Sequence, residues 1–369
     1  MRNPFLAAPT CALAFAALAC GSGSSPGDAS GGGGPDGDSA APAEPITGLT
    51  TGEWSWVPFP DSSCSDGSPT GIGVNPGTGP DLVFFLNGGG ACSSALTCVF
   101  LPTPTATLGP FGQEEFDREI AGIPESILDR TLSDNPFADA TLVFVPYCTG
   151  DVHGGDRVVA YTDDPGGTVH HKGHANVLAF LERVAATYPS PRRLVVTGSS
   201  AGGFGALVNY EAIRSSFPSA QGFLVDDSGP PLESNGGMLI QAGFQNWGLG
   251  DVLDPLCGPG ICEQNLSLGL AALIRNHPAD RFALLSYDAD SIISQFYGIG
   301  QADFTRMLLE MTSDVIDPAP TNARAFIKTG QYHTMLGRPG TVSQNGVPLV
   351  TWLAEEVTGS AGWSTVRPQ

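Results

Sequence analysis

The sequence predicts an α/β protein, in which a doubly wound, mostly parallel sheet carries helices on both faces. Two observations support this fold class. Short apolar runs rich in β-branched and aromatic residues recur from Asp81 onward, as expected of strands that are buried on both faces. Between them lie segments with apolar residues at helical spacing, and this alternation is typical of parallel strands joined by helical crossovers.

The predicted elements follow one another along a single domain. Helices are expected over 174–188, over 301–315 and from Ser200 through Tyr210. No internal repeat interrupts this order, so the sequence predicts one domain over 46–369. The predicted strands, in chain order, are LVFFL (82–86), TLVFVPY (141–147), RLVVTG (193–198), GFLVDD (222–227), FALLSYD (282–288) and ARAFIKTG (323–330).

The first 45 residues carry signals for export rather than for folding. Residues 1–19 place an Arg before an apolar run, which is the pattern of a signal peptide. Cys20 follows Ala-Leu-Ala, which resembles the site at which bacterial lipoproteins are lipidated. Residues 20–45 combine this cysteine with a tether rich in Gly, Ser, Pro and Asp, which has too few apolar residues to form a core. We therefore expect an exported, membrane-anchored lipoprotein, with plain secretion as the alternative.

The net charge and the cysteines indicate which partners and which covalent links to expect. The chain has 16 Lys plus Arg against 37 Asp plus Glu, a formal net charge of −21, which argues against nucleic acid as a partner. An even number of cysteines outside the leader predicts disulfides in an exported protein. No C-x-x-C occurs, so no metal site is predicted. No phosphate-binding glycine motif and no dinucleotide fingerprint is present, so no cofactor is predicted. Two pairings form short loops and the third follows by elimination: Cys92–Cys98, Cys257–Cys262 and Cys64–Cys148.

The segment from Gly198 to Gly202, GSSAG, is the strongest catalytic signal. It fits G-x-S-x-G, the nucleophile elbow of α/β-hydrolases, and lies between a predicted strand and a predicted helix, where that motif requires it. Ser200 is therefore the candidate nucleophile. The alternatives are that its hydroxyl only caps the helix, or that Ser199, which lacks the symmetric glycines, takes its place.

A serine hydroxyl needs a base and an acid that orients the base, and both follow the serine in α/β-hydrolases. His333 lies in the loop after the last predicted strand, where such a fold supplies its base. Asp288 ends the strand nearest to the strand of the histidine and is the first candidate for the acid. Asp290 and Asp227 remain alternatives.

The tetrahedral intermediate of ester hydrolysis needs N–H donors for its oxyanion. One donor is expected from Ala201, directly after the candidate nucleophile. The other is expected from residues 87–92, NGGGAC, which we call the glycine loop. It follows an early strand and can present backbone N–H groups without obstruction by side chains. The alternative interpretation of this loop is a flexible turn.

Several of these segments, taken in order, resemble the pectin acetylesterase and Notum family of serine carboxylesterases over most of residues 52–340. The resemblance implies an α/β-hydrolase-like fold, a triad of Ser200, Asp288 and His333, and a disulfide after the glycine loop. It implies oxyanion donors at Gly89, Gly90 and Ala201. The motifs that carry it are FFLNGGGAC, VPYCTGDVHGG, TGSSAGGFG, VDDSG, SYDADSI and the histidine loop, GQYHTM (330–335).

The chain also departs from that family. Its glycine loop lacks the Trp found in many plant and animal members, and Tyr332 and Thr334 flank His333 where the family has a cysteine beside the histidine. These differences leave the triad intact, but they change the expected acyl pocket. The natural substrate therefore cannot be transferred from the family.

Two other groups of residues have both functional and structural interpretations. Asp151 and His153 either line the site or stabilise a structural loop. The histidines of HHKGH (170–174) either bind a metal or begin a helix, and the lack of a wider ligand pattern favours the second interpretation.

The expected function is that of an exported serine carboxylesterase without cofactor. Its substrate would be an acylated small molecule or polysaccharide carrying short acyl groups such as acetyl. The alternatives are an esterase for longer acyl chains or polyesters, and a surface protein that binds without turnover. The only membrane contact expected is the lipid anchor at Cys20.

Overall fold

The structure, a computed structural model, describes residues 43–368 except 101–108, 163–166, 234–237 and 320. The predicted signal peptide (1–19), Cys20 and nearly all of the tether (20–45) lie outside the described residues. The described part belongs to one compact unit. Within it, no helix combines the length and apolar character needed to cross a bilayer.

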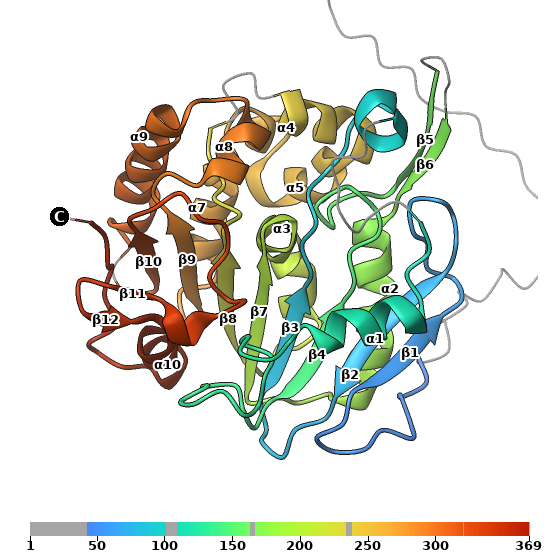
Figure 1. The fold of residues 1–369 in the computed structure, drawn as a ribbon, viewed down its shortest axis with the longest axis horizontal. Helices are drawn as coiled ribbons and strands as arrows, with labels where there is room; N and C mark the ends of the chain where they lie inside the picture. Colours follow the sequence, from blue (N-terminus) through green and yellow to red (C-terminus); the bar gives the residue numbers. More distant parts are fainter. Residues whose placement is uncertain (1–42, 101–108, 163–166, 234–237, 320, 369) are drawn as a thin grey trace, which may run out of the picture. The chain divides into compact units, whose positions relative to one another are not determined.

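An eight-stranded sheet runs through this unit in the order β1-β2-β4-β3-β7-β8-β9-β10 (Figure 1). From β4 to β10 every pair of neighbouring strands is parallel, whereas β1 and β2 are added antiparallel at one edge. The strands are β1 (Ser55–Phe59), β2 (Thr70–Asn75), β3 (Leu82–Leu86), β4 (Thr141–Val145), β7 (Arg193–Ser199), β8 (Gln221–Asp227), β9 (Arg281–Tyr287) and β10 (Ala323–Lys328).

The predicted fold class is confirmed. Each of the predicted strands corresponds to one of the parallel strands, and β3 has the predicted bounds. The antiparallel edge strands were not predicted. Two small hairpins outside the main sheet were also not predicted, β5 (Arg157–Tyr161) with β6 (Gly167–His171) and β11 (Ser343–Gln344) with β12 (Val347–Pro348).

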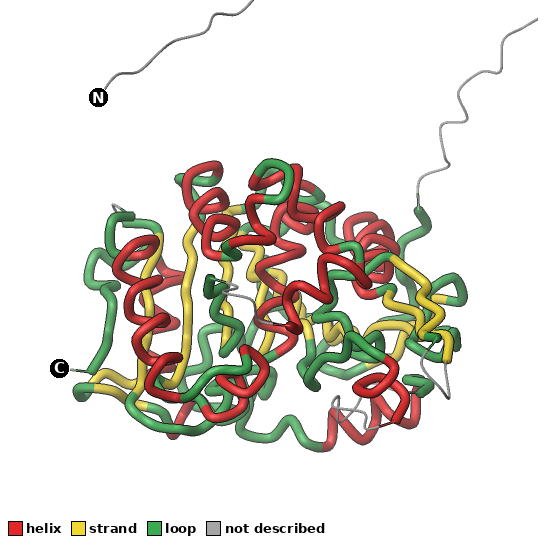
Figure 2. The backbone as a smooth tube through the Cα atoms, turned by 90° about the horizontal axis from the view of Figure 1, so that it is seen from above, coloured by secondary structure: helices red, strands yellow, loops and turns green. Residues whose placement is uncertain are grey.

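Helices lie on both sides of the strands (Figure 2). The three predicted helices are present as α2 (Gly173–Thr187), α3 (Ala201–Ser215) and α9 (Gln301–Met311) with η3 (Thr312–Ile316). The remaining helices and helical turns are α1 (Gln113–Ala121), η1 (Leu96–Phe100), α4 (Met238–Ala242), η2 (Gly243–Trp247), α5 (Leu249–Cys257), α6 (Ile261–Gln264), α7 (Ser267–Asn276), α8 (Ser291–Tyr297), η4 (Pro339–Thr341) and α10 (Leu349–Thr358).

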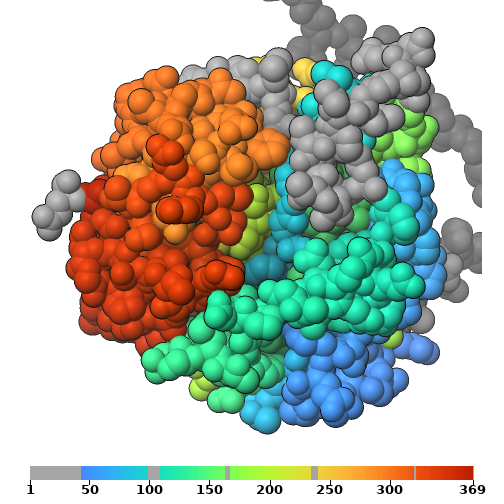
Figure 3. Space-filling model, in the orientation of Figure 1, coloured from blue at the N-terminus to red at the C-terminus, as the bar shows by residue number. Residues whose placement is uncertain are grey.

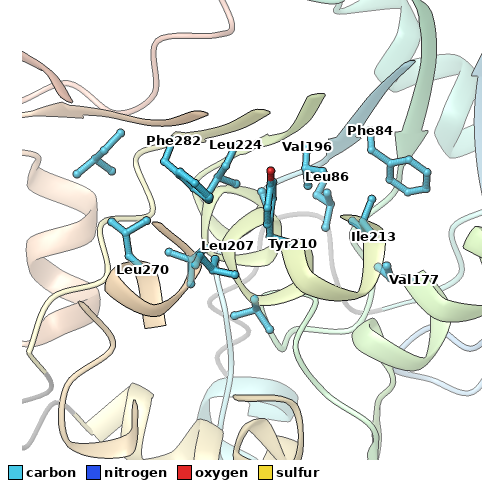
Figure 4. Packing of buried hydrophobic residues seen from close by; sticks show 14 of the residues in the cluster. Phe84, Leu86, Val177, Val196, Leu207, Tyr210, Ile213, Leu224, Leu270 and Phe282 are labelled. Carbon is cyan, nitrogen blue, oxygen red and sulfur yellow. The ribbon is translucent and has the colours of Figure 1, made fainter. Parts of the chain in front are cut away.

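Each face of the sheet has its own apolar core, because successive side chains of a strand point to opposite faces. On one face, Phe84, Val196 and Phe282 of the strands pack with Tyr210 of α3 and Val177 of α2 (Figure 4). On the other face, the intervening strand residues pack with α1 and α10. The sheet is thus buried on both sides, which accounts for the nearly continuous apolar runs in the sequence.

All three predicted disulfides are present. Cys64 is bonded to Cys148, Cys92 to Cys98 and Cys257 to Cys262. The first joins the segment between β1 and β2 to the end of β4. The second closes the segment directly after the glycine loop.

The end of β8 buries two consecutive carboxyl groups, Asp226 and Asp227. Asp226 lies against Gly203 of α3, and its Oδ1 accepts a hydrogen bond from the Gly229 N–H (2.8 Å) in the loop after β8. Its Oδ2 has no hydrogen-bond partner among the described residues. Burial raises the pKa of Asp226 to about 8, and the neighbouring charge of Asp227 acts in the same direction. The Asp226 side chain is therefore protonated at neutral pH.

Asp226 is expected to make the protein less stable as the pH rises from about 4 to about 8. In this window the folded protein holds a proton that the unfolded carboxyl group, with an ordinary pKa of 3.8, has lost, so the unfolded state gains relative stability. Asp226→Asn removes this dependence. Relative to the wild type, the unfolding free energy of Asp226→Asn should therefore rise by at most about 5 kcal/mol between pH 4 and pH 8.

Denaturant unfolding at several pH values measures this difference. Asp303→Asn, at an exposed position on α9, is the matched control and should show little change with pH. A difference for Asp226→Asn that is the same at pH 4 and pH 8 would contradict the assignment of a protonated carboxyl group.

Candidate active site

Ser200 occupies the sharp turn between β7 and α3, as the elbow motif predicts. Its backbone has φ 62° and ψ −121°, a conformation that non-glycine residues rarely adopt and that costs about 1–3 kcal/mol. The Ser200 N–H donates to the carbonyl oxygen of Asp227 (2.7 Å), and the Ser200 carbonyl accepts from the Gly203 N–H (2.9 Å). The Ser200 hydroxyl does not cap α3. The capping alternative is therefore wrong.

The two glycines of the motif are required by close backbone contacts. A Cβ atom on Gly198 would collide with the carbonyl oxygens of Gly202 and Leu86, and one on Gly202 would collide with the Leu86 carbonyl. Because Leu86 is the last residue of β3, these contacts bring the elbow against the beginning of the glycine loop.

His333 lies in the irregular segment after β10, and its ring is oriented by Asp290. Nδ1 of His333 is 2.8 Å from Oδ2 of Asp290. The carboxylate can only accept, so Nδ1 carries the proton and Nε2 is left as an acceptor. Nε2 is buried and has no hydrogen-bond partner in the described part of the chain. The imidazole is thus in the tautomer that accepts a proton from a serine.

Asp290 is itself held in place by a helix. It is the N-cap residue of α8, and its Oδ1 accepts from the N–H groups of Ile292 (2.9 Å) and Ile293 (3.0 Å). Its side chain is completely buried. One oxygen therefore caps the helix while the other orients the histidine.

The prediction that Asp288 orients His333 is corrected to Asp290. β9 ends at Tyr287, one residue before the predicted end, and Oδ1 of Asp288 accepts from the Gly330 N–H (2.9 Å) at the start of the histidine loop. The signal available in the sequence was an N-cap pattern, because Asp290 directly precedes a short helix. Asp227, the remaining alternative, binds backbone N–H groups after His333 rather than its ring.

The predicted oxyanion donors lie beside Ser200. Gly89 and Gly90 have φ values of 156° and 88°, and within the described residues their N–H groups have no acceptor. Ala201 is the first residue of α3, a position whose N–H has no partner inside the helix. Gly90 and Ala201 line one cavity together with Ser200. The arrangement can therefore supply N–H groups to an oxyanion.

His153 contacts the glycine loop and Asp151 stabilises its own loop, and neither residue lines a cavity next to Ser200. Both are buried, and neither lines the two cavities next to Ser200. Nε2 of His153 donates to the carbonyl oxygen of Asn87 (2.8 Å), and burial lowers the pKa of this histidine, which keeps it neutral. The Asp151 carboxylate accepts from the N–H groups of His153, Gly155 and Gly173. The structural interpretation of this loop is thus the better one.

An open cleft contains both Ser200 and His333. It is lined by Gly88, Gly89 and Gly90 on one side and by Ile292 and Phe296 of α8 on the other. In Figure 3 the surface is hollowed between the orange and red C-terminal segments and the green α1, and blue and yellow-green atoms lie at its floor. Candidate nucleophile and candidate base therefore face one shared space.

A second, apolar cavity is also lined by Ser200 and shares Gly90 and Phe296 with the cleft. Trp247 of η2 contributes an indole to the wall and donates from Nε1 to the Cys92 carbonyl (2.9 Å). An indole therefore lines this cavity although the glycine loop contains no Trp. The other apolar side chains of the wall are Ala91, Val152, Ala201, Phe204, Val208, Ile240, Leu249, Leu266, Ile293, Phe296 and Tyr297.

The remaining histidines are engaged in structural hydrogen bonds. His171 contacts the Thr149 carbonyl and the Tyr161 hydroxyl, and His277, which also follows Ser200 in the sequence, contacts Glu211. His170 and His171 lie in β6, not in a helix as expected. Among the described residues the grouping of Cys92, Cys98 and His171 has metal-like spacing, but both thiols are used in a disulfide.

Comparison with known proteins agrees with the motifs of this site. Residues 59–238 match the pectinacetylesterase family. The matched span contains the glycine loop and the elbow, so the family resemblance read from these motifs is confirmed there. His333 and Asp290 lie outside it, and their assignment rests on the geometry described above.

One relative has a known activity. The human (Homo sapiens) palmitoleoyl-protein carboxylesterase NOTUM is 27% identical over 163 residues. The match covers 41% of this chain and 29% of NOTUM, less than a third of that protein.

Proposed function

We propose that the protein is a serine carboxylesterase in which Ser200 is the nucleophile, His333 the base and Asp290 the residue that orients the base. The observation that carries this proposal is the hydrogen bond between His333 and the buried Asp290. This bond leaves Nε2 as an unpaired acceptor, and His333 lines the same cleft as the strained Ser200. The family match over residues 59–238 supports the same reaction class.

The reaction proceeds in two steps. Oγ of Ser200 attacks the acyl carbon while Nε2 of His333 takes the hydroxyl proton and then passes it to the departing alcohol. Water, deprotonated by the same histidine, hydrolyses the acyl-enzyme and restores the serine. The N–H groups of Ala201 and of the glycine loop at Gly89 and Gly90 stabilise both oxyanions.

The apolar cavity next to Ser200 is the proposed site of the acyl chain. The described residues that line it include no charged side chain, and nearly all of them are apolar. A two-carbon acetyl group reaches only the residues near Ser200, whereas a longer chain contacts the whole wall. The cavity therefore favours the longer-acyl alternative over acetyl. The name of the human relative, a palmitoleoyl-protein carboxylesterase, supports this choice.

Hydrolysis of p-nitrophenyl acetate, butyrate and decanoate by the purified, disulfide-bonded protein tests the proposal. We expect kcat/KM to increase with chain length, because each buried methylene contributes about 0.8 kcal/mol. Ser200→Ala should lower kcat by at least about 10⁴-fold, since the residual rate comes from binding and the oxyanion donors alone. Highest kcat/KM on acetate would support the short-acyl interpretation. No turnover by the folded wild type would support a binding protein.

Filling the cavity is expected to change chain-length selectivity. Ile240 of α4 is half-buried and lines the cavity wall, so Ile240→Trp should reduce kcat/KM for decanoate by about 10-fold or more while acetate changes by less than about twofold. Ile261→Trp on α6, an exposed position that does not line the cavity, is the matched control. A uniform loss on all three esters would show that acyl chains bind elsewhere.

We also propose export with a lipid anchor at Cys20, on the leader pattern of residues 1–19. The disulfides are consistent with an oxidising compartment. In a bacterial host, the wild type should partition into the detergent phase of a Triton X-114 extract and Cys20→Ser into the aqueous phase. Equal partitioning of the two would indicate plain secretion.

A further inference from the structure

Asp227, outside the proposed triad, is bonded to the turn that carries the nucleophile. It is the last residue of β8 and is completely buried. Its carbonyl oxygen accepts from the Ser200 N–H (2.7 Å), and its Oδ2 accepts from the Ser199 hydroxyl (2.8 Å). The elbow is thus attached to one residue of the neighbouring strand through both backbone and side chain.

The same carboxylate holds the loop that carries the base. The Met335 N–H lies 3.0 Å from each carboxylate oxygen of Asp227, and the Leu336 N–H lies 2.9 Å from Oδ2. Thr334, between His333 and these donors, has φ 64°, so the chain turns sharply there. The bonds to Asp227 therefore hold the backbone directly after this turn.

Such an attachment matters because the histidine loop lacks regular structure. No helix or strand lies between the end of β10 at Lys328 and η4 at Pro339. The Asp290 carboxylate orients the ring but does not bond the backbone of this loop in the described structure. The position of the histidine loop relative to β7 thus depends on hydrogen bonds to the backbone of the loop. Asp227 accepts such bonds and is also bonded to the elbow.

We propose that Asp227 is a positioning residue that sets the placement of His333 relative to Ser200. This inference rests on the proposed serine esterase reaction. Proton transfer from Oγ to Nε2 needs near-contact alignment, and misplacement by about 1 Å can cost about 10²-fold in rate. Asp227 lines neither cavity next to Ser200, so its loss acts on the chemical step and not on substrate binding.

Burial raises the pKa of the Asp227 carboxyl group, and the hydrogen bonds from Leu336, Met335 and Ser199 oppose this rise because they stabilise the carboxylate. Every group that contacts the carboxylate is a donor, namely two backbone N–H groups and the hydroxyls of Ser199 and Ser228. An asparagine has nearly the same size, but its NH₂ group would face one of these donors. Asp227→Asn therefore disturbs the tie without removing volume.

The test compares kcat and KM of three variants on p-nitrophenyl butyrate, with active sites titrated by a fluorophosphonate. Asp227→Asn should lower kcat per active site about 10- to 100-fold and change KM by less than about twofold, with slower labelling of Ser200. Ser199→Ala, which removes a single donor, should lower kcat about 3- to 10-fold. Asp226→Asn, the adjacent buried carboxyl that does not contact the histidine loop, should retain wild-type kcat.

The outcomes separate this inference from the proposed function. An active wild type together with a folded Asp227→Asn of unchanged kcat per active site would overturn the positioning role alone. A wild type without esterase activity would overturn the proposed function and, with it, this inference. If Asp227→Asn does not fold, Ser199→Ala decides, because wild-type kcat in that variant would contradict the tie.

Discussion

The close packing of the elbow against the end of β3 is the constraint on which the rest of the site depends. Gly198 and Gly202 have no space for a Cβ atom, because the carbonyl oxygen of Leu86 occupies that space. The strained Ser200 turn is stabilised by this contact and by the Asp227 carbonyl. Since the glycine loop begins directly after Leu86, the packing that presents the nucleophile also places the oxyanion donors.

The central part of the fold follows from the sequence, because strands buried on both faces leave nearly uninterrupted apolar runs. The edge strands leave no such signal. β2 has the sequence TGIGVN, whose glycines suggest a loop, and β1 contains Pro58. Both become strands through pairing with each other and with β4. The hairpin β5–β6 was also not predicted, because its histidines suggested the beginning of a helix.

The residues of the site that belong to short sequence motifs could be predicted, whereas those placed by contacts between distant parts of the chain could not. Ser200, Ala201 and the glycine loop are specified by short motifs at a strand end. The sequence favours Asp288 over Asp290 because the choice depends on where β9 ends. The apolar pattern of a strand does not fix its last residue to within one position. The ties of His153 to Asn87 and of Asp227 to the histidine loop join residues far apart in sequence, so no local pattern records them.

Helix α8 both positions the residue that orients the base and lines the apolar cavity, and this limits which substitutions its sequence can accept. Its N-cap is Asp290, and its side chains Ile293, Phe296 and Tyr297 form part of the cavity wall. Any mutation that moves α8 to reshape the wall also moves the carboxylate that orients His333. Adaptation to new acyl groups is therefore less constrained on the opposite wall, at Ile240 and Leu249. In a lineage under selection for new substrates, α8 should change slowly while α4 and α5 diversify.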